Sequence, residues 1–243
     1  MQLLLTMLPQ KPLIIPLHYQ YQLQSAIYSL LGEVGQSDFW HDNGFGNATN
    51  FKGFCFGKLT GDYTIDAEKH LIRFEDQVYL EVRSATFSFI DSFQRAIEHR
   101  PFLTLFDTRL DIVGASLSNQ HFTNGHVILK AVTPVVIRQT TTDGHSYFFS
   151  PEEEEYFIRI CNNAEKKYEA VTGELAENIL LRPKGEFKKT VTKYKGFWIT
   201  GHTGLFELNT SLKMAEFLYN SGLGEKNTQG FGFVNVLNRY EYN

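Results

Sequence analysis

The chain has 243 residues and a formal net charge of −4 at pH 7, and 42% of its residues are hydrophobic. This length suits one large domain or two small ones, and the composition is sufficient for a packed core. The negative balance argues against a protein that coats nucleic acid indiscriminately, although it is compatible with a local basic groove. The sequence contains no apolar run of roughly 18 residues, the length of a membrane-spanning helix.

The cysteines and the N-terminal stretch indicate a compartment. Cys55 and Cys161 show neither CxxC spacing nor a paired framework, which is typical of reduced thiols in a cytosolic protein. Residues 1–9 are apolar, but they are too few and lack the basic start of a signal peptide. We therefore expect a cytoplasmic protein. We also expect no metal and no cofactor, because the sequence contains no HExxH motif and no Cys/His cluster.

The first half of the chain predicts the order strand, helix, strand, strand, helix, strand, which is that of a ferredoxin-like unit. Apolar residues recur at helical spacing in residues 19–31 and 87–99. Ser37 is a suitable N-cap for a further short helix at residues 38–43. The other apolar and alternating runs predict extended segments. These lie at residues 2–8, 51–59, 71–74, 78–84, 103–106 and 110–116.

The second half predicts a similar order of elements. A helix is expected at residues 150–171, with Pro151 at its first position and glutamates in its first turn. A second helix is expected to begin at residue 209 or 210 and to end at 219. Strands are predicted at residues 127–131, 135–137, 179–181, 185–192, 195–203 and 233–237. We place a domain boundary within residues 117–125, which gives domains 1–120 and 121–243.

A glycine-rich stretch near the end of the chain is the most distinctive feature of the sequence. It contains two GxG pairs separated by five residues, formed by Gly222, Gly224, Gly230 and Gly232. Glycine is favoured where φ is positive or where another backbone approaches closely. Successive N–H groups in such a loop can bind a phosphate. The alternative interpretation is an ordinary Gly-rich turn between a helix and a strand.

A basic segment precedes this stretch. Between residues 182 and 195, Glu186 is the only acid, and Phe187 and Tyr194 are interleaved with the basic side chains. If this segment is one arm of a β-hairpin, its basic side chains suit contacts with phosphates. Taken alone, it is more typical of a solvated hairpin whose edge lysines block pairing with another sheet. The candidate residues are Arg182, Lys184, Lys188, Lys189 and Lys193, followed by Lys195.

Three residues of the first half could support proton transfer and charge stabilisation. His41 stands just before Gly44, and a histidine near neutrality can donate or accept a proton. Tyr28 is predicted to lie off the apolar stripe of its helix, where its hydroxyl could meet a ligand or cover a domain seam. Lys52 follows at the start of a predicted strand. Each also has an ordinary structural interpretation, His41 as a surface histidine above all.

Together these segments resemble the CRISPR-repeat endoribonucleases of the RAMP superfamily, which cut precursor transcripts into guide RNAs. The resemblance runs nearly end to end, and the loop pattern GxGxxxxxGFG is its most specific part. It is carried by residues 16–28, 39–45, 51–59, 133–135, 147–168, 195–201 and 222–232. The family implies an α+β fold of two tandem ferredoxin-like (RRM-like) domains, each an antiparallel sheet with helices on one face.

The resemblance also implies a reaction and assigns residues to it. Metal-independent cleavage is expected, in which a ribose 2′-hydroxyl attacks the adjacent phosphate and leaves 2′,3′-cyclic phosphate and 5′-hydroxyl ends. His41 would act as general acid or base, Tyr28 would orient an oxygen, and Lys52 would stabilise charge on the phosphate. Lys58 is an alternative to Lys52, and His18 is an alternative to Tyr28. The glycine loop, with Lys226, and the basic segment would bind the RNA backbone.

Repeat RNA is therefore the expected partner, and effector-complex subunits and a second copy of the chain are further candidates. A different class of function, a non-catalytic RAMP subunit that binds guide RNA, shares the glycine loop but does not need His41. A nucleotide-binding or metabolic enzyme is a third hypothesis. It is disfavoured, because the sequence lacks a GxxxxGK[ST] loop, a GxSxG elbow and a metal motif.

Overall fold

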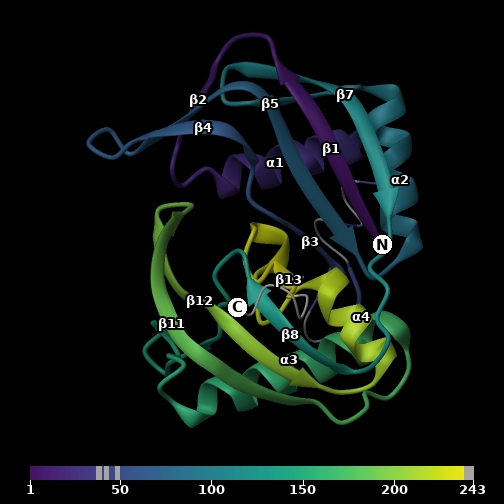
Figure 1. Ribbon diagram of the computed structural model, residues 1–243, viewed down its shortest axis with the longest axis vertical. Coiled ribbons are helices and arrows are strands. Elements are labelled where there is room, and N and C mark those ends of the chain that lie inside the picture. The colour runs from purple at the N-terminus through teal and green to yellow at the C-terminus, as the bar shows by residue number, and fades with distance from the viewer. Residues whose placement is uncertain (37–39, 41–43, 47–49, 238–243) are drawn as a thin grey trace.

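The computed structural model describes residues 1–36, 40, 44–46 and 50–237. It shows an α+β fold with two large antiparallel sheets, one from each half of the chain, and helices on one face of each large sheet (Figure 1). Of the predicted short helix at residues 38–43, only Trp40 is described, and His41 lies outside the described residues. None of the described helices is long and apolar enough to cross a membrane.

The N-terminal sheet has the strand order of a ferredoxin-like fold. The spatial order β7, β1, β5, β4 corresponds to 4-1-3-2 of the basic unit, and every pairing is antiparallel. Helices α1 (Gln20–Gly32) and α2 (Phe87–His99) pack their apolar stripes against it. The strands are β1 (Gln2–Pro9), β2 (Leu13–Pro16), β3 (Phe54–Phe56), β4 (Thr60–Asp66), β5 (Leu71–Ser84), β6 (Phe102–Leu105) and β7 (Thr108–Ser118).

Several sequence predictions in this half are wrong in detail. The two strands expected at residues 71–74 and 78–84 form one strand, β5, because β4 pairs with both parts of it. The register shifts between Gly61 and Tyr63 and passes over the exposed polar residues 75–77. The strand expected at residues 51–59 is limited to Phe54–Phe56. Strands β2 and β4 had no sequence prediction.

The C-terminal sheet repeats the arrangement, with the order β13, β8, β12, β11. Helices α3 (Glu154–Thr172) and α4 (Leu212–Ser221) cover one face, and Figure 1 shows the long β11–β12 hairpin curving away from them. The strands are β8 (His126–Ala131), β11 (Leu180–Tyr194), β12 (Phe197–Asn209) and β13 (Val234–Val236). A small separate hairpin pairs β9 (Arg138–Thr140) with β10 (Ser146–Phe148).

Three predictions in this half are corrected. The strands expected at residues 179–181 and 185–192 form the single strand β11. Helix α3 begins at Glu154, so Pro151 is not its first residue; the Ser150 N–H donates to the Glu153 carboxylate over 2.6 Å and closes a turn before the helix. The strand predicted at residues 135–137 is reduced to isolated bridges, in which Val135 pairs with His202 and Val136 with Glu225.

Each sheet has its own hydrophobic core. One core is built from buried residues between Leu3 and Leu110, and the other from buried residues between Leu129 and Val234. This separation supports the domains 1–120 and 121–243, which we propose as the division of the chain. The domains meet where α4 and the 3-10 helix Asn227–Gln229 contact β3.

Candidate functional site

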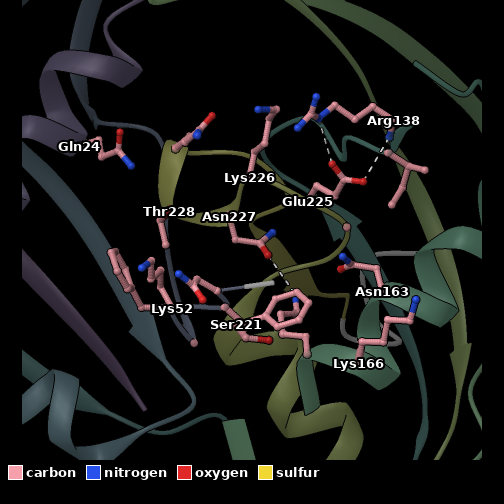
Figure 2. A pocket seen from close by; sticks show the side chains of 18 of the residues that line it. Gln24, Lys52, Arg138, Asn163, Lys166, Ser221, Glu225, Lys226, Asn227 and Thr228 are labelled. Atoms are coloured by element: carbon pink, nitrogen blue, oxygen red, sulfur yellow. Dashed lines mark hydrogen bonds and ion pairs between the residues drawn. The ribbon is translucent and has the colours of Figure 1, made fainter. Parts of the chain in front are cut away.

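A cavity of about 760 Å³ lies between the two domains. The N-terminal domain contributes α1 and residues 50–54, and the C-terminal domain contributes α3, the glycine loop and the end of β11. In Figure 2, Gln24 and Lys52 lie on one side of the cavity, and Asn163 and Lys166 lie on the other. The glycine loop, with Lys226 and Thr228, passes between them. The cavity therefore exists only when both domains are present.

Tight backbone contacts shape the glycine loop. A Cβ on Gly232 would lie 1.9 Å from the Leu223 carbonyl oxygen, and a Cβ on Gly224 would lie 2.6 Å from the Val136 carbonyl oxygen. Both glycines also have positive φ. These positions therefore require glycine for close approach of the backbone.

The loop N–H groups are mostly used within the protein. Those of Gly222, Gly230 and Gly232 donate to backbone carbonyls, at 2.8, 3.1 and 2.9 Å respectively. Of the four predicted glycines, Gly224 is the one that lines the cavity. The loop therefore contributes to a binding surface mainly through its shape and through side chains such as Lys226. Direct RNA contact by the glycines stays a prediction.

Lys167 of α3 supports the loop from beneath. Its buried ammonium donates to the Gly222 carbonyl over 2.6 Å and to Asn227 Oδ1 over 2.9 Å. Asn227 Nδ2 in turn donates to the carbonyls of Leu223 and Phe231. Burial lowers the pKa of Lys167 to about 7. This network fixes both ends of the loop to α3, which no sequence pattern indicated.

The predicted catalytic residues Tyr28 and Lys52 line the same cavity. The prediction that Tyr28 lies off the buried face is wrong, because its ring is in the core and stacks edge-on against Phe54. Its hydroxyl donates to the Trp40 carbonyl over 3.2 Å, immediately before His41 in the chain. The Lys52 side chain packs closely against Gly44, since a Cβ on Gly44 would lie 2.7 Å from Lys52 Cδ.

The two alternative residues lie outside the cavity walls. The ring of His18 packs edge-on against Trp198, with the ring centroids 5.9 Å apart. Lys58 lies close to Lys188 of the other domain, and desolvation followed by the neighbouring charge lowers its pKa. Neither residue therefore accompanies Tyr28 and Lys52 at the cavity.

The predicted basic segment forms β11, the edge strand of the C-terminal sheet. All five of its predicted RNA-binding side chains are exposed, and none lines the cavity. The bulge between Lys184 and Lys188 seats Phe187 over Gly204. The strand then continues to Tyr194, which does line the cavity together with Lys195. The structure thus separates the exposed edge from the cavity.

Sequence reasoning missed several polar residues of the cavity. Arg159, Asn163 and Lys166 face it from α3, and their i, i+4, i+7 spacing on one helix face was the available signal. Arg138 enters from β9 and pairs with Glu225, the only acid among the described lining residues. Cations otherwise dominate, so the cavity is suited to a polyanion. The basic lining residues are Lys52, Arg138, Arg159, Lys166, Lys167, Lys195 and Lys226.

Known proteins resemble this chain over nearly its full length. It is 24% identical over 235 residues to the CRISPR-associated endoribonuclease Cas6 1 of Methanocaldococcus jannaschii, with coverage of 95% and 91% of the two chains. A solved Cas6-related protein from Pyrococcus furiosus has a TM-score of 0.86 at 22% identity, covering 98% and 99%. A solved RAMP protein described as binding different RNA substrates has a TM-score of 0.84 at 20% identity, covering 98% and 100%.

The family comparison agrees with the fold and with the glycine loop. Residues 117–236 match the family model described as CRISPR associated protein Cas6, C-terminal. This range contains the whole C-terminal sheet, α3, α4 and the glycine loop. Residues 117–236 therefore belong to the Cas6 family of CRISPR-associated proteins, and the chain as a whole is similar to Cas6 proteins.

Proposed function

We propose that the protein is a metal-independent endoribonuclease that cleaves CRISPR precursor transcripts within their repeats to give guide RNAs. The observation that carries the proposal is the interdomain cavity, which places Tyr28 and Lys52 opposite a wall of cations on α3 and the glycine loop. The archaeal relative named as an endoribonuclease supports the activity. A single-stranded RNA backbone has the charge that this cavity would attract.

In the proposed reaction, the RNA supplies its own nucleophile. The 2′-oxygen forms a bond to the adjacent phosphorus while the bond from phosphorus to the 5′-oxygen breaks. His41 accepts the 2′-hydroxyl proton or donates a proton to the departing 5′-oxygen. The products are a 2′,3′-cyclic phosphate and a 5′-hydroxyl, which balances atoms and charge without a further reactant.

Lys52 and Tyr28 have supporting roles in this proposal. The Lys52 ammonium stabilises negative charge that develops on the phosphate oxygens. Tyr28, whose hydroxyl donates to the Trp40 carbonyl, orients the attacking or the leaving oxygen. The cations of α3 and the glycine loop hold the flanking backbone of the RNA.

The test uses repeat RNA transcribed from the neighbouring array, incubated with purified protein in excess EDTA. Wild-type protein should cut the RNA, and His41→Ala should cut about 10²- to 10⁴-fold more slowly. The matched control is His99→Ala, which removes an exposed histidine at the end of α2 and should leave the rate unchanged. Replacing the 2′-hydroxyl at the cleavage site by hydrogen should abolish cleavage.

Other outcomes contradict parts of the proposal. Uncut RNA that is nevertheless bound tightly would indicate the non-catalytic RNA-binding subunit. Cleavage by His41→Ala at the wild-type rate would remove His41 from the mechanism. Cleavage of the 2′-deoxy substrate, or a product without a 2′,3′-cyclic phosphate, would show that the nucleophile is not the ribose hydroxyl.

A further inference from the structure

The turn of the β11–β12 hairpin exposes two large aromatic side chains. Phe197 is 77% exposed and Trp198 is 59% exposed, and they begin β12 just after the turn, whereas Tyr194 at the end of β11 is buried. An exposed tryptophan on a soluble surface is uncommon, and it is often part of a binding site. Folding alone therefore does not require these two exposed aromatic side chains beside the hairpin turn.

The Trp198 ring is held in place from both domains. His18 of the N-terminal domain contacts it edge-on, with an interplanar angle of 87°. Lys193, which is paired with Trp198 across the hairpin, places its Nζ 5.7 Å from the ring centroid. An aromatic ring fixed in this way loses little conformational freedom when a flat ligand stacks on it.

A second cavity, of about 530 Å³, opens beside this ring. It combines Phe148, Phe197 and Trp198 with basic side chains. It also continues the interdomain cavity, because the two have lining residues in common. The shared residues are Arg138, Tyr194, Lys195, Lys226 and Gln229. A linear ligand that leaves the first cavity past Lys195 and Lys226 would enter the second.

Aromatic faces flanked by cations are the chemistry that recognises single-stranded nucleic acid: bases stack on the rings and the backbone meets the charges. A peptide strand without acidic side chains would gain little from the basic side chains here. We propose that an unpaired nucleotide of the bound RNA stacks its base on Trp198, while Lys193 and Lys195 contact the adjoining phosphates. This subsite rests on the proposed function, since it extends the RNA path from the interdomain cavity.

The intrinsic fluorescence of Trp198 can report this contact. It has two tryptophans, and Trp40 is 1% exposed, so quenching from solution acts on Trp198. A single-stranded oligoadenylate should reduce the tryptophan emission and protect it from acrylamide. Inorganic polyphosphate of equal charge should bind without either effect, because it has no bases. Equal quenching by polyphosphate, or no quenching by oligoadenylate under conditions where it binds, would overturn the proposal.

Variants test the same contact through affinity. Trp198→Ala should weaken oligoadenylate binding about tenfold, and Trp198→Phe should restore most of it. The salt dependence of binding should be the same in Trp198→Ala as in wild type, since no charge is removed, whereas Lys195→Ala should reduce the slope by about one. Phe87→Ala is the matched control, because it removes a 64% exposed aromatic at the start of α2.

The two proposals can fail separately. If repeat RNA is cleaved but Trp198→Ala binds as tightly as wild type, the stacking subsite is wrong and the proposed function stands. If RNA quenches Trp198 and Trp198→Ala binds weakly, but repeat RNA is never cut, the subsite stands and the catalytic proposal is wrong. Quenching in wild type also gives a result that does not depend on how well the variants fold.

Discussion

At the scale of single residues, Lys167 links the pH to the stability of the glycine loop. Burial lowers its pKa from 10.5 to about 7, so between these values the unfolded chain binds more protons than the folded one. The free energy of unfolding should therefore rise as the pH increases from 7, by up to about 1 kcal/mol per pH unit. Lys167→Met should remove this rise, which chemical denaturation at pH 7.0 to 8.5 would measure.

Lys166→Met is the control for this prediction, because it makes the same chemical change at an exposed neighbour on α3. The comparison between variants also cancels the effect of Cys55, whose pKa burial raises to about 12 and which acts in the opposite direction at higher pH. A wild-type pH dependence in Lys167→Met would show that the ammonium is not the titrating group.

The residue scale also shows what sequence alone could not establish. Helical spacing predicted that Tyr28 points away from the apolar stripe, yet it is buried in the core of its own domain, against Phe54 and the Trp40 carbonyl. A helical projection describes the helix alone, and it contains no information on what packs against the other sides. The same sequence reasoning did select Tyr28, Lys52, Gly224 and Lys226, which the structure brings to one cavity.

At the scale of elements, substitutions in strand β11 would test whether its exposed lysines bind RNA. Lys188→Ala combined with Lys189→Ala should weaken RNA binding and reduce its salt slope by about one to two, as expected for lost phosphate contacts. Fluorescence anisotropy over a salt series would measure both effects. Lys213→Ala, an exposed lysine of α4 paired with Glu174, is the control.

If the salt dependence of RNA binding does not change in this double variant, the alternative interpretation applies, in which the lysines of β11 protect an exposed sheet edge. β11 lies at the edge of the C-terminal sheet, where lysines discourage pairing with the edge of another molecule. In that case the double variant should bind RNA normally but associate with itself at high concentration. Light scattering would detect this association.

Elements also differ in how well their sequences predicted them. Helices α1, α2 and α4 follow from their apolar spacing, because a stripe that recurs over three turns has few other structures available. Strand β4 has a largely exposed pattern, with no apolar alternation of its own, and it is ordered by pairing with β5, the next strand along the chain. Such strands depend on their partners, which explains why sequence reasoning missed β4.

At the scale of the whole molecule, Arg83 joins the two domains. Its buried guanidinium lies between the rings of Tyr219 and Phe233, 3.7 and 4.0 Å from their centroids. It also donates to the Val234 carbonyl over 2.5 Å and to Asn235 Oδ1 over 2.7 Å. Arg83→Ala should destabilise the protein by about 3 kcal/mol, because the acceptors and rings lose a buried partner.

Denaturation and RNA binding together would test this role. Arg83→Lys should recover only part of the stability, since a lysine lacks the planar group that stacks between the rings. Arg73→Ala, at an exposed position of the same strand, should change little. Because the cavity lies between the domains, Arg83→Ala should also weaken RNA binding. Wild-type stability in Arg83→Ala would show that the domains are joined elsewhere.

The packing of the two domains explains why part of the cavity lining could not be predicted from the sequence. The cavity walls come from α1, residues 50–54, β9, α3, the end of β11 and the glycine loop. Arg138 has no local feature that distinguishes it from other surface cations, and Lys166 has only its helical spacing with Arg159 and Asn163. Only the packing of one domain against the other brings them together.

The close approach of Gly232 to Leu223 also changes what the glycine signature means. Gly222, Gly224 and Gly232 are required because the backbone folds tightly against itself and against residues 134–136, whereas Gly230 approaches the side chains of Phe56 and Gln20 in the other domain. A sequence search based on these four positions therefore recovers proteins that share this backbone turn, whether or not they cleave RNA. The signature identifies ancestry and architecture, and activity has to be judged from the residues that face the cavity.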